Sequence, residues 1–131
     1  MIATTLVHAV AASTMLAAPW IVGHRGAGSE SRSNPYPENT LPSIRAAFLQ
    51  GADMVEIDVV LDRNGVPILW HDRHIEVDGR RELVRELALS ELPVQEGPTG
   101  IRAPIPTFWD ALRLALYLGR AQKVMDVEIK V

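Results

Sequence analysis

The chain has 131 residues, a length that fits one domain. Apolar residues make up 47% of it and charged residues 22%, which excludes a disordered or fibrous chain. The net charge of −3 provides no basic surface of the kind that binds nucleic acid, and the lack of cysteine excludes disulfides and thiolate chemistry.

Residues 1–19 are expected to form an apolar N-terminal extension, ahead of one domain at 20–131. Residues 1–18 are small and apolar and contain no lysine or arginine, so they lack the basic start of a typical secretory signal. Three interpretations stay open: a signal on a secreted or periplasmic protein, an extension packed on a cytoplasmic one, and translation from Met15. The run is too short, and contains too much Thr, Ser and His, for a transmembrane span, which needs about 20 apolar residues.

The first half of the domain alternates between strand and helix signals. Residues 20–26 are typical of a short buried strand ended by glycine, and a loop rich in Gly, Ser, Asn and Pro follows. Asn39 or Thr40 caps a predicted helix with Pro42 in its first turn and Gly51 at its end. Two further strands, residues 53–61 and 66–72, are then predicted on either side of a tight turn of the hairpin type at 63–65.

The second half of the domain repeats this pattern. Residues 73–106 are predicted to be a polar stretch, a helical turn near 87–92 and a loop rich in Pro and Gly. A helix follows, with Thr107 and Asp110 as a capping pair and Gly119 as its end. Residues 123–131 form the last predicted strand. The order of strands and helices indicates a parallel sheet built from βαβ units.

Two of the predicted strands carry charges inside apolar runs. Because strand side chains alternate, Glu56 and Asp58 share one face, and Glu128 and Lys130 share one face of the last strand. A single acidic pair is more often a solvated face, but two strands of one sheet favour a common site. Buried carboxylates cost several kcal/mol each unless a cation compensates them, and a hard divalent cation is the simplest remedy. The pattern predicts a metal site where parallel strands end at a barrel mouth.

Two histidines are expected at the same end of the sheet. His24 ends the first predicted strand and His71 ends the third, at C-terminal strand ends, where sites of α/β proteins form. Two imidazoles provide one general base and one general acid near neutral pH, while Arg25 and Lys130 suit a phosphate group. These residues predict metal-assisted hydrolysis of a phosphate ester. The remaining histidines, His8 and His74, are expected to be surface or packing residues.

Seven short motifs together resemble the glycerophosphodiester phosphodiesterase family, in the family's order over residues 21–131. They are HRG at 24–26, PENT at 37–40, GAD at 51–53, EIDV at 56–59, HD at 71–72, IPT at 105–107 and DVEIK at 126–130. The resemblance implies a TIM-barrel enzyme. It also implies that a small-molecule glycerophosphodiester is hydrolysed to an alcohol and glycerol 3-phosphate, with Ca²⁺ or Mg²⁺ as the cation.

The resemblance also implies a role for each matching position. His24 and His71 become the acid–base pair. The implied metal ligands are Glu56, Asp58 and Glu128. The implied phosphate contacts are Arg25 and Lys130, and the supporting polar groups near the metal are Glu38 and Asn39.

Two departures from the family pattern affect what the chain is expected to do. The loop between HRG and PENT is longer than usual, and a complete (β/α)₈ barrel needs about 250 residues. The chain is therefore expected to hold only the first three or so barrel strands, to be marginally stable and to be inactive alone. Two alternatives stay open: a phospholipase D of the sphingomyelinase type, which the PENT stretch disfavours, and a non-catalytic remnant that binds a cation or a partner through sheet edges.

Overall fold

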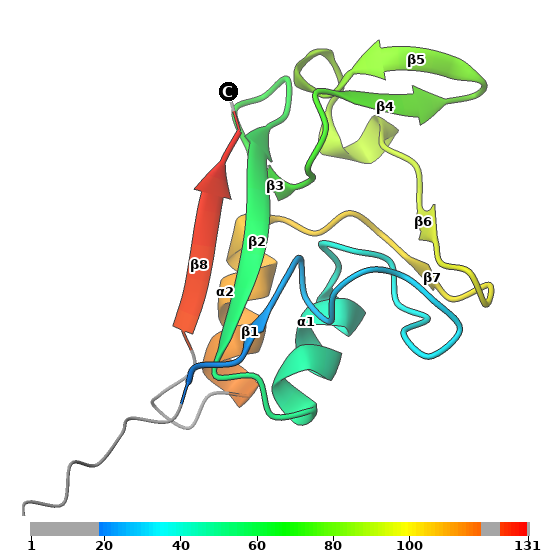
Figure 1. The fold of residues 1–131 in the computed structure, drawn as a ribbon. Coiled ribbons are helices and arrows are strands. Elements are labelled where there is room, and N and C mark those ends of the chain that lie inside the picture. Colours follow the sequence, from blue (N-terminus) through cyan, green and yellow to red (C-terminus); the bar gives the residue numbers. More distant parts are fainter. Residues whose placement is uncertain (1–18, 119–123, 131) are drawn as a thin grey trace, which may run out of the picture.

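The computed structural model describes residues 19–118 and 124–130 (Figure 1). The predictions for residues 1–18 and for Gly119 lie outside this part of the chain. Within the described ranges, no helix has the length and apolarity to span a membrane.

The central strand of the main sheet is β2 (Met54–Leu61). Strand β8 (Val124–Ile129) runs parallel along one edge of it. The opposite edge is shared by two strands, because β1 (Val22–Gly23) pairs in parallel with the start of β2 and β3 (Pro67–Leu69) pairs antiparallel with its end. The described strands thus form an open, mostly parallel sheet, as expected for part of a TIM-type barrel (Figure 1).

Alternation along β2 separates a core face from a charged face. Val55, Ile57 and Val59 are buried in the main apolar cluster, which the two long helices cover. Glu56 and Asp58 point to the other face, since successive strand side chains alternate. The predicted division of this strand is confirmed.

Both predicted helices are present with their predicted N-terminal caps. Helix α1 (Leu41–Leu49) begins after Thr40, whose side chain accepts a hydrogen bond from the backbone N–H of Ser43. Helix α2 (Phe108–Leu118) begins after Thr107, which exchanges backbone-to-side-chain hydrogen bonds with Asp110 at 3.1 and 3.2 Å. Each cap satisfies backbone N–H groups that lack a partner within the helix.

The segment between β3 and α2 has more structure than predicted. A second apolar cluster, which includes Val60, Ile68 and Val84, packs it against the sheet. The elements are β4 (His74–Val77), β5 (Arg80–Leu83), η1 (Val84–Glu86), η2 (Leu89–Glu91), β6 (Gln95–Glu96) and β7 (Arg102–Ala103). The helical turn expected near 87–92 is present as η2, but the hairpin of β4 and β5 was not predicted, because its strands are short and polar.

The strand predicted over residues 20–26 is present, but it is shorter and less buried than predicted. Only Val22 and Gly23 pair with β2, and Trp20 and Ile21 are each 62% exposed. The apolar pattern indicates residues suited to burial, but whether they are covered depends on which segments pack beside them.

Candidate active site

Two strands approach the same edge of β2 from opposite directions, and their ends carry the two histidines of interest. Strand β1 runs parallel to β2, so His24 follows at the level of Glu56. Strand β3 runs antiparallel, so the chain comes back along β2, and the backbone N–H of Trp70 donates to the carbonyl of Asp58 at 3.2 Å. His71 therefore reaches the charged face of β2 from the direction opposite to that of His24.

This geometry corrects the predicted reason for the position of His71. The residue was expected at a C-terminal strand end, where sites of α/β sheets form. Strand β3 is instead the second strand of the hairpin predicted around residues 63–65, and it carries His71 back to the middle of β2. The turn had indicated the antiparallel direction of this strand, but the position of His71 had not been derived from it.

Three carboxylates of the sheet lie close together. One oxygen from each of Glu56, Asp58 and Glu128 lies within 4.8 Å of the others. Asp58 and Glu128 are directly opposite each other in the parallel pairing of β2 and β8, so their side chains leave the sheet on the same face. The structure brings together the three residues for which a metal-binding role was predicted.

Asp58 is buried, and three side chains bind its carboxylate. Oδ2 lies 3.1 Å from Nε of Arg25 and accepts a hydrogen bond of 2.9 Å from Asn39, while Oδ1 lies 3.1 Å from Nζ of Lys130. Burial alone would raise the pKa of Asp58. The hydrogen bonds from Asn39 and Lys130 and the charge of Lys130 outweigh it and hold the pKa below its ordinary value. Asp58 therefore stays ionised at neutral pH.

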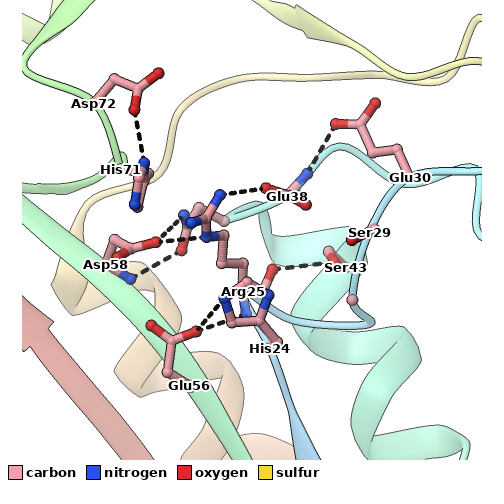
Figure 2. Close-up of polar contacts among 12 residues, drawn as sticks. His24, Arg25, Ser29, Glu30, Glu38, Ser43, Glu56, Asp58, His71 and Asp72 are labelled. Carbon is pink, nitrogen blue, oxygen red and sulfur yellow. Dashed lines mark hydrogen bonds and ion pairs between the residues drawn. The ribbon is translucent and has the colours of Figure 1, made fainter.

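Arg25 connects the loop after β1 to the acidic face. Its backbone N–H donates to Oε2 of Glu56 at 2.8 Å, and its Nη1 donates to Oε2 of Glu38 at 2.9 Å. Figure 2 shows its side chain between Glu38 and Asp58. Burial alone would lower the pKa of Arg25, but the hydrogen bond and charge of Glu38, with the charges of Asp58 and Glu56, raise it. The guanidinium group is thus permanently charged.

Arg25 and Asn39 also share an uncommon backbone conformation. Their φ angles are 50° and 54°, in the left-handed region that residues other than glycine rarely adopt. Both residues hold Asp58, and Asn39 also accepts the backbone N–H of Asp58 at 3.0 Å. Such strain concentrates at functional sites, where the surrounding contacts maintain it.

Sequence reasoning gave no role to Ser43, which supports this loop from α1. Its hydroxyl oxygen accepts the backbone N–H of Ala27 at 2.9 Å and donates to the carbonyl of Arg25 at 3.4 Å. Its place in the first turn of a capped helix indicated a buried polar residue, but not which loop it would contact. Ser43 therefore helps to fix the backbone that presents Arg25.

The two histidines have different partners. Nε2 of His24 lies 3.9 Å from Oε2 of Glu56, whereas Nδ1 of His71 lies 2.6 Å from Oδ1 of Asp72 (Figure 2). Both rings are partly solvent-exposed and therefore accessible to a ligand. His74 begins β4, and its Nδ1 lies 3.5 Å from Nη2 of Arg81, as expected of a surface or packing residue.

The donor set of this face suits a hard divalent cation. Its ligands would all be carboxylate oxygens, which Mg²⁺ and Ca²⁺ prefer. Oε1 of Glu56 is buried without a hydrogen-bond partner among the described residues, and such an atom is costly unless something else binds it. Nζ of Lys130 contacts both Asp58 and Glu128, so a positive charge is already accommodated between two of these carboxylates.

Known protein sequences resemble this chain over most of its length. A model of the glycerophosphoryl diester phosphodiesterase family matches residues 24–131. A glycerophosphodiester phosphodiesterase of Caldanaerobacter subterraneus is 28% identical over 116 residues, which is 84% of this chain and 44% of that protein. A Mus musculus glycerophosphocholine phosphodiesterase is 38% identical over 82 residues, 60% of this chain and 12% of that protein.

Solved structures show the same relationship. A phosphodiesterase of Oleispira antarctica, in complex with the product sn-glycerol-3-phosphate, has a TM-score of 0.68 and 30% identity, covering 86% of this chain and 44% of that one. A glycerophosphodiester phosphodiesterase of Agrobacterium tumefaciens has a TM-score of 0.69 and 27% identity, covering 86% and 47%. The chain spans less than half the length of each of these relatives. With a family match over most of its length and a partial TIM-barrel fold, the chain belongs to the glycerophosphodiester phosphodiesterase family.

Proposed function

We propose that the chain provides catalytic residues of an enzyme that, when its barrel is complete, hydrolyses glycerophosphodiesters to an alcohol and glycerol 3-phosphate with the help of Ca²⁺ or Mg²⁺. The observation that carries this proposal is the cluster of three carboxylates within 4.8 Å. Two cationic side chains adjoin this cluster. The Oleispira antarctica relative, whose structure contains glycerol 3-phosphate, supports the assignment of the product.

The cation would be held by Glu56, Asp58 and Glu128. When bound, it supplies Lewis-acid stabilisation of the negative charge that develops on the phosphate oxygens. The fixed partners of the buried Asp58 keep this ligand ionised and in place. The three ligands come from two paired strands, so the sheet itself sets their spacing.

Arg25 and Lys130 are the proposed phosphate contacts. Both are charged and adjoin Asp58, and Arg25 offers the planar donors that match phosphate geometry. Glu38 and Asn39 act in support, because Glu38 binds the guanidinium group of Arg25 and Asn39 binds the carboxylate of Asp58. The phosphate group of the substrate would thus take the place of the carboxylates that pair with Arg25 and Lys130 in this structure.

His24 and His71 are the proposed proton-transfer groups. Hydrolysis breaks the bond between phosphorus and the alcohol oxygen, and that oxygen must receive a proton as it leaves. The attacking water molecule must lose a proton as its new bond to phosphorus forms. Two imidazoles reaching the site from opposite directions along β2 can divide these two transfers between them.

Replacing the histidines tests this assignment in a form of the protein that completes the barrel. We expect His24→Ala and His71→Ala each to lower turnover of glycerophosphocholine by ~10²-fold or more, the usual effect of losing a general acid or base. His74→Ala is the matched control and should leave turnover unchanged. The measurement is the release of glycerol 3-phosphate with Ca²⁺, with Mg²⁺ and with a chelator.

Two outcomes would contradict the proposal. Turnover of either variant within about threefold of wild type would exclude that histidine as a proton-transfer group. Full activity in the presence of a chelator would exclude the metal site. Choline release from sphingomyelin but not from glycerophosphocholine would instead support the alternative phospholipase D activity.

A further inference from the structure

Residues 70–74 follow β3 and are held in place at both ends. The backbone N–H of Trp70 donates to the carbonyl of Asp58 at 3.2 Å, and its indole Nε1–H donates to the carbonyl of His74 at 3.1 Å. These contacts fix the backbone of His71 beside the carboxylates of the site. They leave the orientation of its ring to the neighbouring side chains.

The imidazole ring of His71 is hydrogen-bonded to the next residue. Nδ1 lies 2.6 Å from Oδ1 of Asp72, as Figure 2 shows. An ionised carboxylate only accepts hydrogen bonds, so the proton in this bond belongs to Nδ1. A neutral imidazole carries one N–H group and one lone pair, so Nε2 is left with the lone pair. The contact selects one of the two tautomers.

The solvent exposure of His71 and Asp72 indicates how much their contact adds to the stability of the fold. The side chain of His71 is 37% exposed and that of Asp72 is 70% exposed, so water screens the attraction between them. An exposed ion pair adds little to the stability of a fold. Its effect on the ring is different, because the tautomer depends on which nitrogen has an acceptor beside it, as in the aspartate–histidine pairs of hydrolases.

We propose that Asp72 is a positioning residue that holds His71 with Nδ1 protonated and Nε2 free to exchange a proton with the substrate. The inference rests on the proposed role of His71 in proton transfer. The other histidine is held differently, since Nε2 of His24 adjoins Glu56, a proposed metal ligand. Asp72 lies in the HD motif, yet sequence reasoning gave it no role, because adjacency in sequence does not show a contact between side chains.

Nitrogen-15 NMR of the imidazole rings tests the proposal directly. The measurement is made in a chelator at a pH where the histidines are neutral, and His71 is assigned with His71→Gln. We expect the Nδ1–H tautomer of His71 to dominate in the wild-type protein and the Nε2–H tautomer in Asp72→Ala. Glu76→Ala, which removes an exposed carboxylate from β4, is the matched control and should leave the tautomer unchanged.

An unchanged tautomer in Asp72→Ala would overturn the proposal, and so would the same change in Glu76→Ala. This measurement requires no turnover, so it is independent of whether the protein hydrolyses a diester. In an active form, Asp72→Ala should lower kcat roughly tenfold, less than the ~10²-fold effect of losing His71 itself. It should have no further effect in a His71→Ala background, and an equal loss in both backgrounds would also overturn the proposal.

Discussion

Asp58 is the buried carboxylate of the site, and it contacts both basic residues, Arg25 and Lys130. Its pKa lies below the ordinary value of 3.8, because its hydrogen bonds outweigh the opposing effect of burial. A carboxyl group with a lower pKa in the folded state stabilises the fold above its unfolded pKa. That stabilisation is lost as the pH falls through the folded pKa.

We therefore expect Asp58→Asn to lower the free energy of unfolding at pH 7 by about 2 kcal/mol, because it leaves Arg25 and Lys130 without their shared partner. The difference from wild type should shrink below about pH 4 and vanish below the folded pKa of Asp58. Urea unfolding between about pH 2 and 7 in a chelator measures this. Asp126→Asn, at an exposed position of β8, is the control, and a pH-independent difference for Asp58→Asn would contradict the assignment.

Lys130 is a proposed phosphate contact. In this structure it pairs with two of the proposed metal ligands, Asp58 and Glu128. Its hydrogen bonds to Glu128 and Asp58 raise its pKa, so the ammonium group stays charged through the neutral range. A cation that binds Asp58 and Glu128 must displace this group or bind beside it.

We expect Lys130→Met to bind Ca²⁺ or Mg²⁺ roughly tenfold more tightly than wild type in the absence of phosphate, because one repelling charge is removed. Turnover in an active form should fall, since a phosphate contact is lost. Titration calorimetry measures the affinity, with Arg113→Met on the exposed side of α2 as the control. Weaker metal binding by Lys130→Met would show that Lys130 assists the cation rather than competes with it.

At the scale of elements, the site depends on how closely α1 packs against the loop after β1. Gly26 has a φ of 102°, and a Cβ atom there would lie 2.3 Å from Oγ of Ser43. Gly28 has a φ of 86° but no atom within 4 Å of such a Cβ. Substitutions at the two glycines therefore distinguish the effect of a left-handed backbone from the effect of too little space for a side chain.

We expect Gly28→Ala to cost about 1–2 kcal/mol of stability, the strain of a left-handed alanine. Gly26→Ala should cost about 1–3 kcal/mol more, because the extra methyl group overpacks the contact with Ser43. It should also lower the metal affinity, since Arg25 lies on the displaced loop and its backbone N–H binds Glu56. Equal stability losses in the two variants would show that the loop and helix can separate without cost.

At the level of the whole molecule, both edges of the described sheet carry exposed apolar side chains. Ile21, just before β1, and Val22, in β1, are 62% and 48% exposed, and Val124 and Ile129 are 39% and 73% exposed in β8. Strand edges with exposed apolar side chains favour pairing with other chains, and a lysine on such an edge discourages it.

We expect residues 1–131 expressed alone to be marginally stable, to self-associate and to be inactive toward glycerophosphodiesters. Light scattering measures the association, and thermal unfolding is recorded on the same samples. Ile129→Lys should reduce association, whereas Leu116→Lys, on an equally exposed helix position at 71%, should change it little. A cooperatively folded monomer with metal-dependent turnover would refute this expectation.

The charges, the period of each element and the order of the motifs can be read from the sequence alone. The alternation along β2 identified Glu56 and Asp58, and the capping residues located both helices, because these signals depend on neighbouring residues alone. The same local signals predicted that Glu128 and Lys130 share a face of the last strand. They explain why the candidate metal and phosphate residues were found before the fold was known.

How these residues meet depends on the tertiary structure. The contact of Ser43 with the loop of Arg25 and the exposure of Trp20 and Ile21 depend on segments that are not neighbours in the chain. The antiparallel direction of β3 is different, because it follows from the tight turn at residues 63–65. Periodicity shows that a strand has an apolar face, but it contains no information on what covers that face. That property follows from long-range pairing and packing, which the alternation of single residues does not encode.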